Sequence, residues 1–218
     1  MTLEVTMIEV EPIRIFFVED NDVIRFALKS LLKHVADFAV IGDASDGASA
    51  IEKLSAEPAS VILIDIGLPD IDGIEVTKHV KTMLPGSRVL MLTASEDESD
   101  IFDALDAGAD GYVLKSAYAK NLEAAIRSVR LGAVWLDPAI ARLVLQAAQR
   151  PPSKRQLHKV EPIALSAEEK TLLDQVAHSD CQDGVCLVKP DFLQKLRRFS
   201  GKNGAANTVN ESQMQSQA

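Results

Sequence analysis

The sequence has little cysteine, no long apolar run and no excess of positive charge. Two cysteines in 218 residues are too few for a disulfide framework, which suits a reducing cytosol. No apolar run approaches the roughly 20 residues that are needed to span a membrane. The first 12 residues lack the basic and apolar regions of a signal peptide. We therefore expect a cytoplasmic protein with no membrane partner.

Negative charge is concentrated in the first part of the chain. Residues 1–150 hold 24 acidic and 14 basic side chains, a net charge of −10, whereas residues 151–218 have a net charge of +1. Contacts with nucleic-acid phosphates need cationic side chains, so the acidic part is not expected to bind DNA. The length allows one well-packed domain and a smaller second region.

Apolar runs alternate with helical patterns over residues 12–132. The runs at 13–18, 38–44, 60–64, 88–92 and 111–115 predict strands, and the segments at 22–35, 47–57, 73–84, 95–109 and 119–132 predict helices. Strands that are apolar throughout are typical of a parallel sheet covered on both faces. We therefore predict an α/β domain over residues 12–132, a doubly wound parallel sheet of five strands.

Local patterns also predict how two of these helices lie. The buried stripe of the first helix is predicted to consist of Val23, Phe26, Ala27, Leu31 and Leu32. In the fourth helix, Ser95 and Glu98 have the spacing of a capping box, which predicts a helix start at Ser95.

Polar residues follow the predicted strands where a ligand site is expected. In an open parallel sheet this site lies beyond the carboxyl ends of the strands. The residues at these ends are Glu19, Asp20, Asp65, Thr93, Ala94 and Lys115. Carboxylates about 4 Å apart repel by about 4 kcal/mol per pair at an effective dielectric near 20, so such a cluster tends to hold protons or a cation. Oxygen ligands suit Mg²⁺, and a carboxylate beside Mg²⁺ can attack phosphorus.

A less specific interpretation applies to each of these residues alone. An acid after an apolar strand is often only a turn former, and a lysine there is often a solvated strand end. Asp65 becomes a candidate site residue because other polar strand ends are expected beside it. Asp70 and Asp72 are interpreted as ordinary loop residues.

Four motifs, FVEDND, LIDIGLPDIDG, MLTA and GYVLKS, resemble the receiver domain of bacterial two-component response regulators in order and spacing. The resemblance implies a flavodoxin-like strand order, 2-1-3-4-5, and a phosphoryl group accepted on Asp65. It implies that Mg²⁺ is held by Glu19, Asp20, Asp65 and the Gly67 carbonyl. It places Thr93, Ala94 and Lys115 at the phosphoryl oxygens and makes Tyr112 the switch aromatic.

The same resemblance implies partners and excludes one enzyme class. The phosphoryl donor is expected to be a cognate histidine kinase or a small phosphodonor, and phosphorylation is expected to switch a surface or drive homodimerisation. Phosphatases similar to haloacid dehalogenase also form an aspartyl-phosphate, but they need a second Asp two residues after the nucleophile. Gly67 stands at that position. We therefore expect that the protein is not an enzyme and that it dephosphorylates itself slowly at most.

Residues 133–162 predict a helix followed by a polar linker. The segment LGAVWLDPAIARLVLQAAQ resembles the helix after the receiver in regulators of the NarL/FixJ class, which carry a LuxR-type helix-turn-helix. Pro138 suits the first helical position. The apolar stripe is predicted to consist of Ile140, Leu143, Val144 and Ala147.

Residues 163–202 predict a small, mainly helical output-like region. The segment LSAEEKTLLDQVAHSD resembles the first LuxR-type helix, but the expected recognition helix does not follow, so the helix-turn-helix is degenerate or truncated. A basic helix over 189–201 either packs with solvated charges or contacts nucleic acid. Residues 203–218 are rich in Gln, Asn and Ser and predict a disordered tail.

The two cysteines flank a predicted hairpin turn. Asp183-Gly184 favours a two-residue turn, which would set Cys181 and Cys186 opposite each other as a candidate redox pair. The alternatives are a metal site that includes His178, which lacks a recognised ligand spacing, and two free thiols.

Two hypotheses remain for the output. One is a transcription regulator with a divergent DNA-binding region. The other is a module that acts through protein contact or dimerisation when it is phosphorylated. The missing recognition helix favours the second hypothesis, and the resemblance favours the first.

Overall fold

The computed structural model describes residues 11–95, 97–149, 167 and 170–171. The strands are β1 (Ile13–Val18), β2 (Phe38–Ala44), β3 (Val61–Ile64), β4 (Arg88–Thr93), β5 (Gly111–Leu114) and β6 (Trp135–Leu136). The helices are α1 (Asp22–Leu32), α2 (Gly47–Ala56), α3 (Gly73–Met83), α4 (Glu98–Asp106), α5 (Tyr118–Arg130) and α6 (Pro138–Gln149). The predicted hairpin with Cys181 and Cys186, the basic helix and the tail lie outside the described residues.

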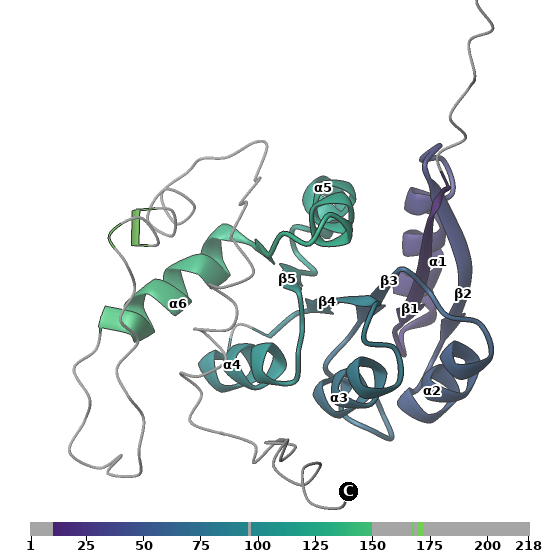
Figure 1. Cartoon of the computed structure of the whole chain (residues 1–218), viewed down its shortest axis with the longest axis horizontal. Helices are drawn as coiled ribbons and strands as arrows, with labels where there is room; N and C mark the ends of the chain where they lie inside the picture. Colours follow the sequence, from purple (N-terminus) through teal and green to yellow (C-terminus); the bar gives the residue numbers. More distant parts are fainter. Residues whose placement is uncertain (1–10, 96, 150–166, 168–169, 172–218) are drawn as a thin grey trace, which may run out of the picture.

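The strands form one parallel sheet in the order β2-β1-β3-β4-β5-β6 (Figure 1). This confirms the predicted α/β fold and the order of its first five strands, and it adds a sixth strand. The chain winds outward from β1 in both directions, so the carboxyl ends of β1 and β3 border the switch point of the topology. A ligand site is expected at this place in an open α/β sheet.

Helices cover both faces of the sheet. Alternate strand residues face opposite sides, so Phe17 and Leu63 pack with α1 and α5, whereas Phe16 and Ile62 pack with α2, α3, α4 and α6. Figure 1 shows α3 and α4 on the side of the sheet away from α5. Within the described parts of the chain, no helix is both long enough and apolar enough to cross a membrane.

The predicted buried stripe of α1 is wrong in part. Val23 and Phe26 are 76% and 72% exposed, while Leu28 and Leu32 are fully buried. Helix α1 carries two overlapping apolar stripes, and periodicity alone does not choose between them. The helix begins at Asp22, as predicted, and the Asn21 side chain caps it by accepting hydrogen bonds from the amides of residues 23 and 24.

The predicted start of α4 at Ser95 is also wrong. The helix begins at Glu98, and Asp97 is its N-cap, accepting from the Ser99 amide at 2.9 Å. The Ser95 hydroxyl instead accepts from the Asp97 amide at 3.1 Å and donates to Asp100 at 2.8 Å. An acid two residues further along therefore takes the capping role that the capping-box pattern assigned to Ser95.

A buried acid joins the sixth strand to the rest of the fold. Asp137 follows β6 and is 2% exposed. Its carboxylate accepts from the Leu114 amide at 2.8 Å, the Trp135 indole at 3.1 Å and the Asn121 side chain at 3.2 Å. After it, α6 begins at Pro138 as predicted, and its stripe residues Ile140, Val144 and Ala147 are buried in the same core as α4. The segment after α5 is thus packed onto the sheet.

We predict that Asp137→Ala lowers the free energy of unfolding by about 3 kcal/mol, because it leaves buried donors without an acceptor. The measurement is urea unfolding followed by circular dichroism, with linear extrapolation. Glu57→Ala is the control: it removes an exposed ion pair with Arg14 and should cost less than about 1 kcal/mol. Equal losses for the two variants would contradict a structural role for Asp137.

Candidate functional site

The carboxyl ends of four strands carry the predicted site residues to one rim of the sheet. Glu19 and Asp20 follow β1, Asp65 follows β3, Thr93 ends β4, and Lys115 follows β5. Backbone hydrogen bonds extend the ladders past the strand ends: the Asp65 amide donates to Val18 O at 2.9 Å, and the Lys115 amide donates to Thr93 O at 2.8 Å. Carboxylate oxygens of Glu19, Asp20 and Asp65 lie within 4.8 Å of one another. The structure therefore brings together the acids that the sequence placed at strand ends.

The Lys115 ammonium lies between two of these acids. Its Nζ is 2.7 Å from Glu19 Oε2 and 2.8 Å from Asp65 Oδ2, and the three side chains are largely buried. One cation among three carboxylates leaves a formal charge of −2 when all are ionised. This excess of negative charge favours a bound divalent cation.

Burial and charge pull in opposite directions on these groups. Burial raises the pKa of Glu19, and the bond to Lys115 opposes that shift without cancelling it. Burial alone would lower the pKa of Lys115, but hydrogen bonds to Asp65 and Glu19 outweigh it, so the pKa of Lys115 is raised. The lysine is therefore a fixed positive charge at neutral pH.

The donor atoms suit a hard metal ion. The acidic group consists of carboxylate oxygens, with one exposed acid, Asp20, open to solvent. Mg²⁺ prefers such oxygens and retains several waters, so a half-open acidic rim fits it better than a closed cage. Gly67 lies in the adjacent loop, where a Cβ would be 3.9 Å from Asp65 Oδ2. This places Gly67 near the Asp65 carboxylate, while the role of its carbonyl as a metal ligand stays a prediction.

Thr93, Ser95 and Tyr112 form a connected group next to the acids. Thr93 is 3% exposed, its Oγ1 accepts from the Ser95 amide at 3.0 Å, and its side chain is also hydrogen-bonded to Tyr112. The Tyr112 hydroxyl donates to Ser95 O at 3.3 Å, and its ring is fully buried. Burial, together with the charge of Asp100, raises the pKa of Tyr112, which therefore remains a neutral donor. Ala94 is exposed at the rim.

The two loop acids interpreted as ordinary have defined structural roles. Asp70 accepts from the Gly47 amide at 2.8 Å and from the Ala48 amide at 2.9 Å, and these bonds lower its pKa. It thereby ties the loop after Asp65 to the start of α2, a contact 23 residues away that sequence pattern cannot show. Asp72 is the N-cap of α3 and accepts from the Ile74 amide at 2.7 Å. An acid directly before a helical pattern was the signal for that role.

Gly73 is a further residue that sequence analysis missed. A Cβ at this position would lie 1.9 Å from Asp65 O and 2.9 Å from Ile66 Cα. The Gly73 amide also donates to Ile66 O at 2.9 Å. The first residue of α3 therefore packs directly on the backbone of the central acid, and this closeness requires glycine.

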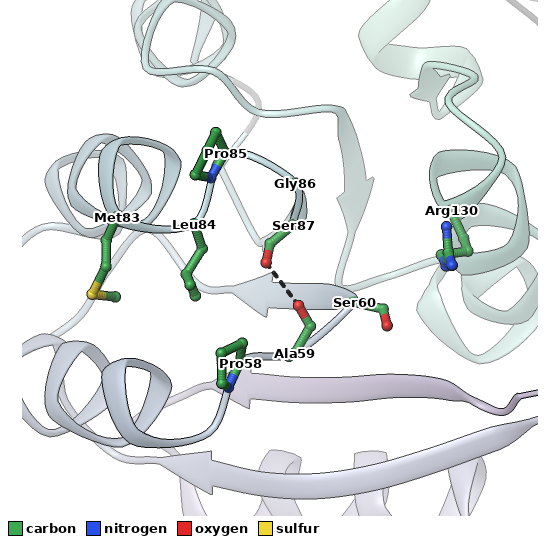
Figure 2. Close-up of a pocket in the computed structure, with 9 residues that line it drawn as sticks. All are labelled: Pro58, Ala59, Ser60, Met83, Leu84, Pro85, Gly86, Ser87 and Arg130. Carbon is green, nitrogen blue, oxygen red and sulfur yellow. Dashed lines mark hydrogen bonds between the residues drawn. The ribbon is translucent and has the colours of Figure 1, made fainter.

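A pocket of about 450 Å³ lies away from this rim (Figure 2). Its lining includes Ser60 and Ser87, which precede β3 and β4, so it opens at the amino ends of the strands. The Ser87 hydroxyl already donates to Ala59 O at 2.7 Å. Arg130 is the charged group at its edge. The pocket lacks the convergent polar groups of the rim, and we do not assign it a role in chemistry.

We predict that Gly73→Ala lowers the free energy of unfolding by about 1–3 kcal/mol, because the added methyl group overlaps the Asp65 carbonyl. It should also weaken Mg²⁺ binding, since the backbone of Asp65 must shift. Gly86→Ala is the matched control, as no atom lies within 4 Å of its Cβ position. Thermal unfolding and Mg²⁺ titration measure both effects. If both alanine variants behave alike, the close approach at Gly73 is not a constraint.

Comparison with known proteins supports a single family. The profile of the response regulator receiver domain matches residues 15–127. Response regulator protein VraR of Staphylococcus aureus is 35% identical over 128 residues, which are 59% of this chain and 61% of that protein. The chain thus spans 61% of the length of this curated relative. The matching family is that of response regulator receiver domains, which are not classical enzymes.

Solved structures give the same result. A LuxR-family two-component response regulator from Aurantimonas sp. is similar with a TM-score of 0.60 and 28% identity, over 62% of this chain and 97% of that one. The receiver domain of the putative response regulator NarL from Mycobacterium tuberculosis is similar with a TM-score of 0.54 and 29% identity, over 56% and 98% of the two chains. The acidic rim, the sheet order and these similarities agree: the chain belongs to the response regulator receiver domain family.

Proposed function

We propose that this chain accepts a phosphoryl group on Asp65, with Mg²⁺ bound at the same rim. The observation that carries the proposal is the Lys115 ammonium, which lies 2.8 Å from Asp65 Oδ2 within a group of three clustered acids. Such an acidic triad is typical of the Mg²⁺ site of receivers. Glu19, Asp20, Asp65 and the Gly67 carbonyl would hold the ion, which supplies positive charge for the phosphoryl oxygens.

The chemical step is the transfer of a phosphoryl group from a nitrogen or oxygen atom of the donor to a carboxylate oxygen of Asp65. A bond forms between an Asp65 oxygen and phosphorus, and the bond from phosphorus to the donor breaks. The leaving group keeps that electron pair and takes its proton from solvent. Lys115 forms an ion pair with one phosphoryl oxygen, and the Thr93 hydroxyl donates a hydrogen bond to another. Ala94, exposed and small, leaves room for the group.

The signal would reach the surface through Thr93 and its neighbours. The phosphoryl group adds about −1.5 to −2 charges, and a Thr93 hydroxyl drawn toward it changes the bond to the Ser95 amide. Ser95 O is also the acceptor of the Tyr112 hydroxyl, and Tyr112 packs in the core that α4 and α6 share. A rearrangement of this group would therefore alter the surface over α4 and β5. We propose that a protein partner or a second copy recognises the altered surface, in the cytoplasm.

We predict that acetyl phosphate with Mg²⁺ labels the wild-type chain and that Asp65→Asn abolishes labelling, because the amide is not a nucleophile for phosphorus. Asp72→Asn is the control, since it removes a carboxylate from the same loop but keeps a good N-cap. The measurement is intact-protein mass spectrometry. Equal labelling of Asp65→Asn and the wild type would refute the assignment.

A second candidate function is DNA-binding regulation. The observation in its favour is the similarity to a LuxR-family response regulator of known structure, which is 28% identical to this chain. The sequence of residues 165–180 also resembles the first LuxR-type helix. The similarity to that regulator covers 62% of this chain. No stretch of the sequence after residue 178 matches the expected recognition helix, the element that would present three or four side chains to base edges.

We predict that the phosphorylated chain binds DNA weakly and with little sequence preference, because its net charge is −9 and phosphate contacts need cations. Selection from a pool of random duplexes is the measurement. Beryllofluoride with Mg²⁺ provides a stable stand-in for the phosphoryl group. Recovery of one motif that binds at nanomolar strength in physiological salt would establish the DNA-binding function instead.

A further inference from the structure

The Arg25 side chain of α1 forms hydrogen bonds with the backbone of the loop that carries Glu19 and Asp20. Its Nη1 donates to Glu19 O at 2.7 Å and to Asp20 O at 2.9 Å. Its Nε lies 3.4 Å from Asp43 Oδ2, and its Nη2 donates to Asp22. The side chain is 17% exposed. One guanidinium therefore holds two successive carbonyl groups of the loop while acids at the end of β2 and the start of α1 fix the guanidinium.

These contacts determine how the loop presents its carboxylates. A carbonyl oxygen fixes the plane of its peptide unit, so two held carbonyls fix the peptides on both sides of Asp20. Asp20 is the exposed member of the acidic group, and Glu19 is buried against Lys115. Because Asp20 faces solvent, the direction of its carboxylate depends on the backbone beneath it. Arg25 holds that backbone.

We propose that Arg25 is a positioning residue for the metal site: its hydrogen bonds from Nη1 to Glu19 O and Asp20 O preorganise the acids for Mg²⁺. The inference rests on the proposed Mg²⁺ site. Arg25 contacts neither the ion nor the phosphoryl group and acts through the loop backbone. Groups that orient the ligands of a metal change its affinity by about 10- to 100-fold in other sites.

Charge alone gives the opposite expectation, which makes the proposal testable. Arg25 is a cation near a site whose formal charge is −2. If charge were its main effect, removal of Arg25 would strengthen Mg²⁺ binding, and lysine would replace it without loss. If position is the main effect, Arg25→Gln and Arg25→Lys both weaken binding, because lysine lacks the planar fork that reaches two carbonyls and an acid together.

The test is Mg²⁺ titration of the full chain by calorimetry and by the NMR shifts of the amides in the loop. We expect the Mg²⁺ dissociation constant to rise on the order of tenfold for Arg25→Lys and for Arg25→Gln. The rise should persist at high KCl, where a charge effect is screened. Without Mg²⁺, the loop amides of both variants should already be shifted, since the carbonyls have lost their donor.

Lys29→Met is the matched control. Lys29 pairs with the same Asp43, at 2.8 Å from Oδ1, so this variant removes a neighbouring positive charge and leaves the fork in place. Its Mg²⁺ affinity should stay within about twofold of wild type. Circular dichroism verifies that each variant is folded. A folded Arg25→Lys chain with wild-type affinity would overturn the inference, as would tighter binding by Arg25→Gln.

The same titration separates this inference from the proposed function. Asp20→Ala should weaken Mg²⁺ binding if the ion occupies the acidic rim. If the wild type fails to bind Mg²⁺, or if Asp20→Ala binds it as the wild type does, both the Mg²⁺ site and the role of Arg25 are refuted. If Asp20→Ala weakens binding and Arg25→Lys does not, the site stands and the role of Arg25 is refuted alone.

Discussion

The ion pairs of Lys115 with Glu19 and Asp65 are the interaction on which the site depends. Burying a carboxylate without a partner is costly, and here two are buried at one rim. In the sheet order, β5 is two strands away from β3, a separation of about 10 Å. A long, flexible cation can cross the end of β4 to reach both acids, and Lys115 does so.

The groups that surround each acid show whether its role is structural or chemical. Asp46, Asp70, Asp72 and Asp97 accept hydrogen bonds from backbone amides at helix starts, where the helix dipole also favours negative charge. Asp110 and Asp137 are buried against several donors. Glu19, Asp20 and Asp65 differ because they lie beside one another. Carboxylates that lie close together with few hydrogen-bond donors around them are the ones suited to bind a cation.

Sequence pattern predicted the sheet and the rim because both depend on short-range information. An apolar run shows a buried strand, and the residue that ends it must lie at the rim, so Asp65 and Lys115 could be placed without coordinates. The faces of α1 could not, because Val23 and Phe26 form one helical stripe and Ile24 and Leu28 form another. Asp70 accepts a hydrogen bond from an amide 23 residues away, and Gly73 packs against the backbone of Asp65. Neither contact can be read from the sequence around these residues. The two-residue strand β6 is too short to show any periodicity.

The same short strand affects how the sheet ends. An outer strand exposes unpaired backbone groups to which another chain can add a strand, and natural proteins often keep such strands short or cover them with lysine. At one end, β6 offers two residues before the chain turns into α6. At the other end, Lys53 Nζ donates to Asp43 O of β2 at 2.9 Å and occupies an outward carbonyl of the longer strand. In the part of the chain that the structure describes, both borders of the sheet therefore carry features that disfavour edge-to-edge pairing.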